Sequence, residues 1–299
     1  EASANIYGNL FFYDDSVTSS GSILPYRVYA RFSGERYELR AGLQKIDFGS
    51  AMILRPLQWF NEIDPRDPLA ITAGVNAFLG RYYFLNNANI WLWGLYGNNK
   101  PRGFDVFGPS NDKPEFGGRF QHPVPKGEIA ISYNHRNADA STLTNNPEHA
   151  AVPEDRIGLD GKWDVGIGLW FETSLIKKHV NIGAFTNQTL LTIGADYTLG
   201  IGSGLNVVGE HFIFGYDENS FGFANKSNTT ALSLSYPIGF FDRLSIFATY
   251  TWEAKAPSFF LNFQHDFRKI TGYLMAYYTP STNLNIGNEE SAFVSSFTG

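Results

Sequence analysis

Apolar and polar residues alternate over many short stretches of the chain. The alternation is found at residues 26–32, 37–44, 129–134, 156–163, 167–175, 191–197, 232–236 and 243–252. Neighbouring side chains of a β-strand point to opposite faces of the sheet, so an alternating run predicts a strand with one apolar and one polar face. Long stretches with helical periodicity are hard to find. The sequence therefore predicts an all-β protein.

The segments between these runs form two groups by length. Short ones lie at 33–36, 85–89, 122–127, 163–166, 200–204, 237–243 and 267–269. Longer polar ones lie at 14–22, 55–69, 98–114, 137–153, 177–187, 216–228 and 280–290. The two groups alternate along the chain, except that the link near 253–257 is short where a long one is expected. This order predicts an antiparallel up-and-down sheet of about 16 strands (14–18), each of roughly ten residues, which is the length a tilted strand needs to cross a bilayer.

Composition changes this picture in a specific direction. Charged residues make up only 17% of the 299 residues and aromatic residues 16%, while mean hydropathy is -0.20. Few charges with moderate hydropathy fit a structure that is apolar outside and polar inside. Aromatic residues near the predicted strand ends fit the girdles of a membrane barrel, although strands are enriched in aromatic residues in any protein. A sheet in lipid must close on itself, because no backbone group there can stay unpaired.

Other classes of protein fit the composition less well. The chain has no cysteine, which excludes a disulfide scaffold and thiol catalysis and is compatible with export. The net charge of -6 argues against a nucleic-acid partner, which needs a concentrated basic face. No apolar run is long enough to predict a transmembrane helix. No signal peptide is visible, so in an exported protein Glu1 would follow the cleavage site.

At this point the chain resembles a Gram-negative outer-membrane β-barrel of porin type, without matching a named subfamily. The runs RYELRAGLQKIDFG (36–49) and EFGGRFQHPVPKGEIAISYNHR (115–136) look like strand–turn–strand units of such porins. The resemblance implies one barrel domain over 1–299, short periplasmic turns, long extracellular loops and contact with outer-membrane lipid. It also implies passage of small hydrophilic solutes or ions and, by analogy, a possible homotrimer. The chain ends Thr298–Gly299, whereas such barrels commonly end on an aromatic residue.

Charged residues in the alternating runs are expected to face the lumen, because a charge facing lipid near the midplane costs about 2–4 kcal/mol. Most basic ones come from the first half of the chain and the eighth strand, while several carboxylates come from the second half. One interpretation is a transverse field between a basic and an acidic wall, and the other is a network of ion pairs that braces the barrel. The residues are Arg27, Arg31, Glu38, Arg40, Arg119, Glu128, Arg136, Arg156, Asp160, Lys162, Glu172, Asp196, Glu210, Arg243 and Glu253.

The segment RPLQWFNEIDPRDPL (55–69) is dense in proline and charge and lies between two alternating runs. Its prolines cannot donate ladder hydrogen bonds, so it is not continued strand. The surrounding apolar residues need something to pack against. We therefore expect a long loop over 49–70 that folds into the lumen and narrows it, and the alternative is a loop that caps the rim or contacts another chain. The expected constriction residues are Arg55, Trp59, Phe60, Glu62, Asp64, Arg66 and Asp67.

Catalytic and metal signals are weak. His211 follows Glu210 and His265 precedes Asp266, but neighbours on a strand point to opposite faces and form no dyad through adjacency. The acidic residues at 62–67 match no ordered calcium motif, and GIGSG (200–204) is better explained as a tight turn. We expect no enzyme, no catalytic residue, no metal and no cofactor.

Three functions remain open. The leading one is a porin-like channel for passive diffusion. The second is a structural or partner-binding outer-membrane barrel with a plugged lumen, part of a larger envelope complex. Aromatic residues on predicted inward faces, at Phe247, Phe260, Tyr273 and Tyr277, favour this second function. The third is a soluble β-rich protein that binds carbohydrate.

Overall fold

The computed structural model describes residues 2–13, 16–69 and 71–279, and these form a single antiparallel sheet of fifteen strands. The strands are β1 (Ala2–Tyr13), β2 (Ser16–Ser33), β3 (Tyr37–Gln44), β4 (Val75–Tyr83), β5 (Asn89–Leu95), β6 (Glu115–Val124), β7 (Gly127–Ala138), β8 (Val152–Asp164), β9 (Gly168–Lys178), β10 (Asn187–Leu199), β11 (Leu205–Asp217), β12 (Asn225–Ile238), β13 (Asp242–Thr251), β14 (Ala256–Asp266) and β15 (Thr271–Tyr278). Two short helical turns, α1 (Ser141–Thr144) and η1 (Pro147–Ala151), lie between β7 and β8.

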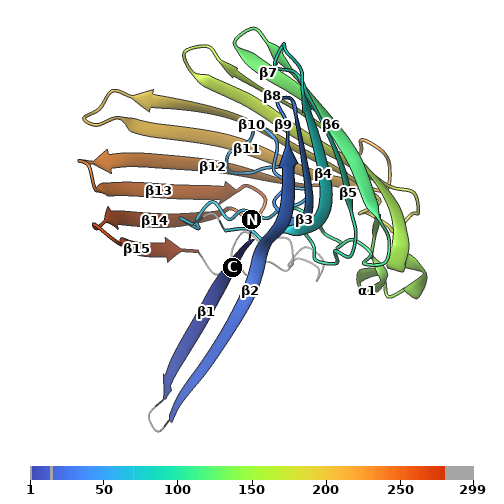
Figure 1. The fold of residues 1–299 in the computed structure, drawn as a ribbon, viewed down its shortest axis with the longest axis horizontal. Helices are drawn as coiled ribbons and strands as arrows, with labels where there is room; N and C mark the ends of the chain where they lie inside the picture. Colours follow the sequence, from blue (N-terminus) through green and yellow to red (C-terminus); the bar gives the residue numbers. More distant parts are fainter. Residues whose placement is uncertain (1, 14–15, 70, 280–299) are drawn as a thin grey trace.

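Each strand pairs only with its neighbours in sequence, so the sheet is an up-and-down meander. It curves strongly around a central space, while the β1–β2 hairpin extends away from the rest (Figure 1). The all-β antiparallel prediction is confirmed. Within the described residues the sheet has fifteen strands rather than sixteen, and the pairing ends at β1 and β15 without joining them.

Connections of different length lie at the two ends of the strands. The links 34–36, 84–88, 125–126, 165–167, 200–204, 239–241 and 267–270 are short. At the other end, 45–74 and 96–114 are long, and 252–255 is the short exception that the sequence indicates. The polar segment 14–22 was expected to be a loop, but strand β2 starts at Ser16. Its backbone pairs with β1 from Ser16 opposite Tyr13 onward, because ladder hydrogen bonds need no apolar side chain. The predicted loop 280–290 lies outside the described residues.

The two faces of the sheet differ in chemistry. On β8, Glu154, Arg156 and Asp160 are buried, whereas Ile157 and Leu159 between them are exposed. We call the face that carries the buried polar residues the inner face. Large apolar side chains cover the outer face, which reverses the usual order of a globular protein. They include Phe32, Leu39, Phe78, Leu92, Phe116, Phe120, Ile131, Ile157, Leu159, Ile193, Leu232, Ile246 and Leu274.

The apolar core lies on the inner face, where two loops pack against the sheet. One cluster joins residues of loop 45–74 to β4 and β5: Ile46, Phe48, Leu57, Trp59, Phe60, Val75, Ala77, Leu79, Trp93 and Leu95. The other joins both loops to β9, β10 and β11, and it includes Ala51, Ile53, Leu54, Phe107, Trp170, Ile176, Leu190, Val208, Phe212 and Phe214. The core therefore depends on loops that enter the curve of the sheet.

Candidate functional site

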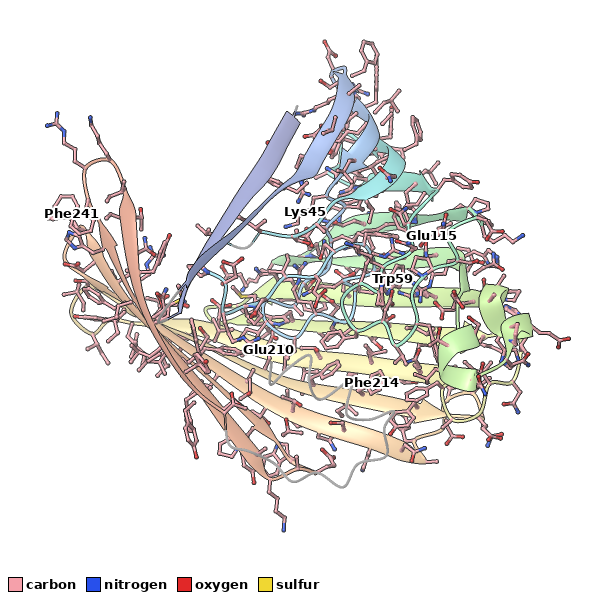
Figure 2. All side chains as sticks on the ribbon, turned by 90° about the horizontal axis from the view of Figure 1, so that it is seen from below. Lys45, Trp59, Glu115, Glu210, Phe214 and Phe241 are labelled. Carbon is pink, nitrogen blue, oxygen red and sulfur yellow. The ribbon has the colours of Figure 1, made fainter. Side chains whose placement is uncertain are left out.

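Loop 45–74 leaves β3 and returns to β4 by way of the inner face. Figure 2 shows Trp59 within the curve of the sheet, on the same side as Glu210. The side chains of Trp59 and Phe60 are only 2% and 1% exposed. The inner face of the sheet thus provides the packing surface that the apolar side chains of the loop require. The backbone of residues 55–69 forms no strand, as its prolines require.

Aromatic rings fix the middle of this loop. Phe48 stacks on Trp93 of β5 with ring centroids 5.4 Å apart, and Phe60 meets the same ring edge-on at 5.3 Å. The indole Nε1 of Trp59 donates a hydrogen bond of 3.0 Å to Ser174 Oγ on β9. The loop therefore spans from β5 to β9 across the inner face.

Two buried carboxylates hold the backbone of the loop. Glu172 on β9 accepts hydrogen bonds from Ala51 N at 2.8 Å and Leu57 N at 2.6 Å. Glu210 on β11 accepts three, from the N–H groups of residues 52–54 at 2.7, 3.1 and 2.6 Å, and a fourth of 2.9 Å from the indole of Trp170. Hydrogen bonds to an ionised carboxylate are shorter and stronger than neutral ones. The strand carboxylates thus replace the ladder partners that the loop backbone lacks.

Further contacts hold loop 45–74 against the inner face of the sheet. Ser50 Oγ donates to Asp160 at 3.0 Å, and Asp160 is paired with Arg119 at 2.6 and 2.9 Å. Gly158 faces the loop so closely that an added Cβ would lie 2.4 Å from Leu57. A larger residue at Gly158 would have to move the loop. Because Gly158 has no side chain, loop 45–74 can approach the inner face of β8 closely at this position.

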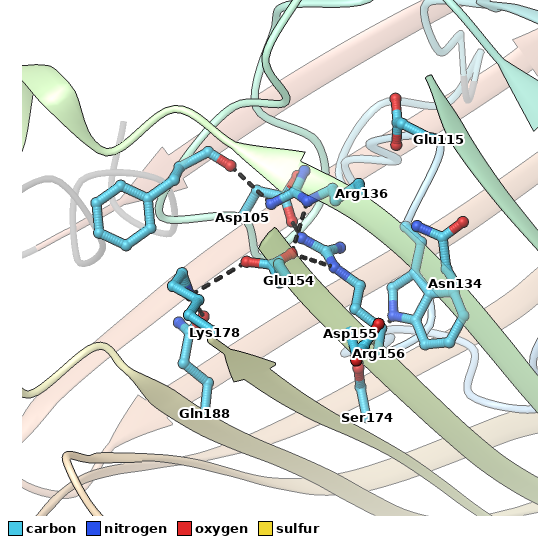
Figure 3. A network of polar contacts seen from close by, with 12 residues as sticks. Asp105, Glu115, Asn134, Arg136, Glu154, Asp155, Arg156, Ser174, Lys178 and Gln188 are labelled. Carbon is cyan, nitrogen blue, oxygen red and sulfur yellow. Dashed lines mark hydrogen bonds and ion pairs between the residues drawn. The ribbon is translucent and has the colours of Figure 1, made fainter. Parts of the chain in front are cut away.

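The second long loop, 96–114, also enters the inner face, and an ion-pair network holds it there (Figure 3). Asp105 accepts hydrogen bonds from Arg136 at 2.7 Å and from Arg156 at 2.6 Å. Glu154 accepts from the same two arginines at 2.6 and 2.7 Å and lies 3.1 Å from Lys178 Nζ. All these side chains are at most 2% exposed. The network therefore joins the loop to β7, β8 and β9.

The pattern of residues did not predict that loop 96–114 faces inward. Phe104 stacks on Phe212 with centroids 4.6 Å apart, and Phe107 is buried against Phe185. Arg102 pairs with Glu115 at 2.7 Å, and both side chains are nearly fully buried. The available signal was the same as for the first loop: phenylalanines at 104 and 107 within a proline- and glycine-rich polar segment.

The predicted constriction residues fall into separate groups. Arg55 braces the loop itself, because it donates to Asp47 at 2.8 Å and to the carbonyl of Phe48 at 3.1 Å. Asp67 accepts from the backbone N–H groups of residues 69 and 71 and so fixes a turn. Trp59 and Phe60 anchor the loop. The remaining three, Glu62, Asp64 and Arg66, lie together beside a cavity.

The predicted lumen charges share the inner face by strand register, except Glu253, which lies exposed in the connection 252–255 and accepts hydrogen bonds from Asn228. The surroundings of the others differ. Most of those that contact the loops are buried and hydrogen-bonded: Arg119, Arg136, Arg156, Asp160, Glu172 and Glu210. Arg27 is half-buried and donates to the carbonyl of Thr72 in loop 45–74 at 3.1 Å. Glu38 is also buried and pairs with Arg40 at 2.8 Å and with Arg31, two arginines on neighbouring strands. A further group near the short-turn ends is exposed or half-buried: Glu128, Lys162, Asp196 and Arg243. At the buried positions the geometry is that of a bracing network, and Glu172 and Glu210 bind backbone N–H groups instead of facing the basic residues across a gap.

A cavity of about 120 Å³ lies between the two loops and strands β13 to β15. Its loop side carries Glu62, Asp64 and Arg66, and Arg66 Nε donates to Asp64 at 2.9 and 3.2 Å. Partial burial, together with the negative charges of Asp64 and Asp105, raises the pKa of the Glu62 carboxyl above its ordinary value. The cavity is the place where charged loop residues face the strands across open space.

No protein-family model matches the chain, and no curated protein is similar to it. Within residues 2–13, 16–69 and 71–279, no group of three or more His, Cys, Asp or Glu side chains is placed to hold a metal ion. The same residues include no helix of the length and hydrophobicity that spanning a membrane demands.

Proposed function

We propose that the chain is a transmembrane β-barrel of the bacterial outer membrane that lets small hydrophilic solutes or ions diffuse through a lumen narrowed by its own loops. The outer face supports the membrane assignment, because exposed apolar side chains alternate with buried polar ones on the same strands. The curved meander (Figure 1) and the separation of short and long connections support a barrel-like wall, and its closure by pairing of the two edge strands β1 and β15 is part of the proposal. Oligomers such as a homotrimer are compatible with this proposal and are not required by it.

The observation that carries the proposal is the anchoring of loop 45–74 on Glu172 and Glu210. The loop starts at β3 and is held by buried carboxylates on β9 and β11. It therefore reduces the cross-section of the proposed barrel at a fixed position along the barrel axis. Selectivity in a channel comes from the width and the charge of its narrowest part. The loops pack mainly against β4 to β11, whereas the cavity lies beside β13 to β15, so we propose that the passage runs along these last three strands.

Conductance in planar lipid bilayers tests the channel. The purified protein is expected to give discrete current steps, because an aqueous passage of fixed width carries a fixed current. A protein preparation unfolded by heating serves as the control. A folded barrel without current steps would refute the channel.

The second candidate function is a plugged barrel that binds a partner in the envelope. It is favoured by the amount of the inner face that the two loops cover and by the aromatic side chains on the inner face of β13 to β15. A folded, membrane-inserted protein that carries no current would support this candidate.

The lipid-facing assignment is tested by Ile131→Arg. Ile131 is 53% exposed in the middle of β7 on the outer face. An arginine facing the bilayer midplane is expected to lower the free energy of unfolding in phospholipid by about 2–4 kcal/mol. Leu85→Arg is the matched control, because Leu85 is 82% exposed in the short turn 84–88 and is expected to change stability little. Equal stability of the two variants and the unchanged protein in urea titrations would contradict the assignment.

A further inference from the structure

The cavity beside β13 to β15 has two unlike walls. Register places Phe247 opposite Phe260 on β14, and Phe260 opposite Tyr277 on β15. The three rings therefore form a row across neighbouring strands, and all three line the cavity. Most of the remaining lining comes from the two loops: segment 62–66, Ile53, Leu54 and Gln58 of loop 45–74, and Gly103 and Phe104 of loop 96–114.

The charge of the loop wall is negative. Asp64 and Arg66 form an ion pair with each other. The residues that the structure describes form neither a hydrogen bond nor an ion pair with the Glu62 carboxylate, although its backbone N–H donates to Thr72. One carboxylate is thus left to interact with whatever enters the cavity.

An aromatic wall and a carboxylate together favour one class of ligand. The face of an aromatic ring attracts a cation, and the attraction grows when water is excluded. A carboxylate across the cavity attracts the same charge. An anion would be repelled by both, and a neutral solute would gain from neither charge interaction. We propose that this cavity is a binding site for small organic cations with an alkylated ammonium group.

The inference rests on the proposed function in one respect only: the cavity selects solutes for transport only if it lies in the passage of a channel. Binding itself follows from the walls and is measurable without any current. An organic cation in this site would sit between Glu62 and the ring row, in the path left open by the loops. The site would then favour cations over anions among the solutes that pass.

Saturation-transfer NMR on the protein in a polyoxyethylene detergent tests the site. Choline and 3,3-dimethylbutan-1-ol have the same shape, but only choline is charged. Choline is expected to bind about tenfold more tightly than the alcohol, as a cation held by rings and a carboxylate should. Equal binding of the two probes would overturn the proposal, and so would binding of glucose in place of choline.

Variants locate the binding. Glu62→Gln is expected to weaken choline binding about tenfold, because it removes the opposing charge and keeps the shape. Phe260→Leu is expected to weaken it severalfold. Glu148→Gln is the matched control on an exposed loop, and it is expected to leave binding unchanged. Unchanged choline binding in both cavity variants would place the site elsewhere. Absence of current with choline binding intact would refute the channel and leave the site standing.

Discussion

In the proposed channel, replacing Glu172 and Glu210 together by alanine is expected to raise the single-channel conductance severalfold. The two carboxylates accept hydrogen bonds from five backbone N–H groups of loop 45–74, two on Glu172 and three on Glu210. Hydrogen bonds to a charged group contribute about 1.5–3 kcal/mol each, and a buried donor without a partner costs about 1–3 kcal/mol. Without the carboxylates, these N–H groups form better hydrogen bonds with water than with the inner face of the sheet. The loop is therefore expected to leave the inner face, and the proposed passage to widen.

Planar-bilayer recordings measure the change, and chymotrypsin reports the loop. Trp59 and Phe60 are buried in the unchanged protein, so cleavage beside them is expected only when the loop is released. Glu128→Ala is the matched control, since Glu128 is an exposed inner-face carboxylate that bonds only to the side chain of Gln121 among the described residues. A variant whose loop is cleaved but whose conductance is unchanged would show that loop 45–74 does not narrow the passage.

Replacing Glu154 by alanine is expected to cause the largest loss of stability of any single charge removal on the inner face. Glu154 is buried between Arg136, Arg156 and Lys178, and its removal leaves three buried cations with the single carboxylate of Asp105. Breaking a buried ion pair by removing one partner costs about 3–5 kcal/mol, because an uncompensated charge stays in the interior. Urea titration of the protein in phospholipid vesicles, followed by tryptophan fluorescence, measures the loss.

Asp64→Ala provides the comparison. Asp64 also pairs with an arginine, but its side chain is 45% exposed, and exposed pairs contribute about 0–1 kcal/mol. The same substitution should therefore separate a buried network from a surface pair. If Glu154→Ala were no more destabilising than Asp64→Ala, the network would not hold loop 96–114 in place.

The alternation of residues predicted the sheet because the two faces of each strand meet different surroundings. The strand β8 shows this directly, with Arg156 and Asp160 inside and Ile157 and Leu159 outside. Segment 14–22 was misassigned because serine and threonine are common in loops, yet backbone pairing does not require apolar side chains. Local pattern therefore predicts faces better than it predicts where a strand begins.

The site was predicted less completely than the fold. The need of Trp59 and Phe60 for a packing surface pointed to an inward loop, and the prolines excluded strand. The residues that hold the loop, Glu172 and Glu210, were known only as inner-face charges, because their partners are backbone groups far away in sequence. Loop 96–114 was missed for the same reason: Asp105 finds its arginines on strands that follow the loop.

The anchoring of loop 45–74 also constrains the order in which the molecule assembles. Every strand pairs with the next in sequence, so the wall can grow one hairpin at a time. The backbone of Met52 nevertheless bonds to Glu210, 158 residues further along the chain. Bringing together residues that are far apart in sequence has an entropic cost, which falls once the intervening strands have paired. Because Glu210 lies on β11, we expect the docking of loop 45–74 to be a late step that follows the pairing of most strands.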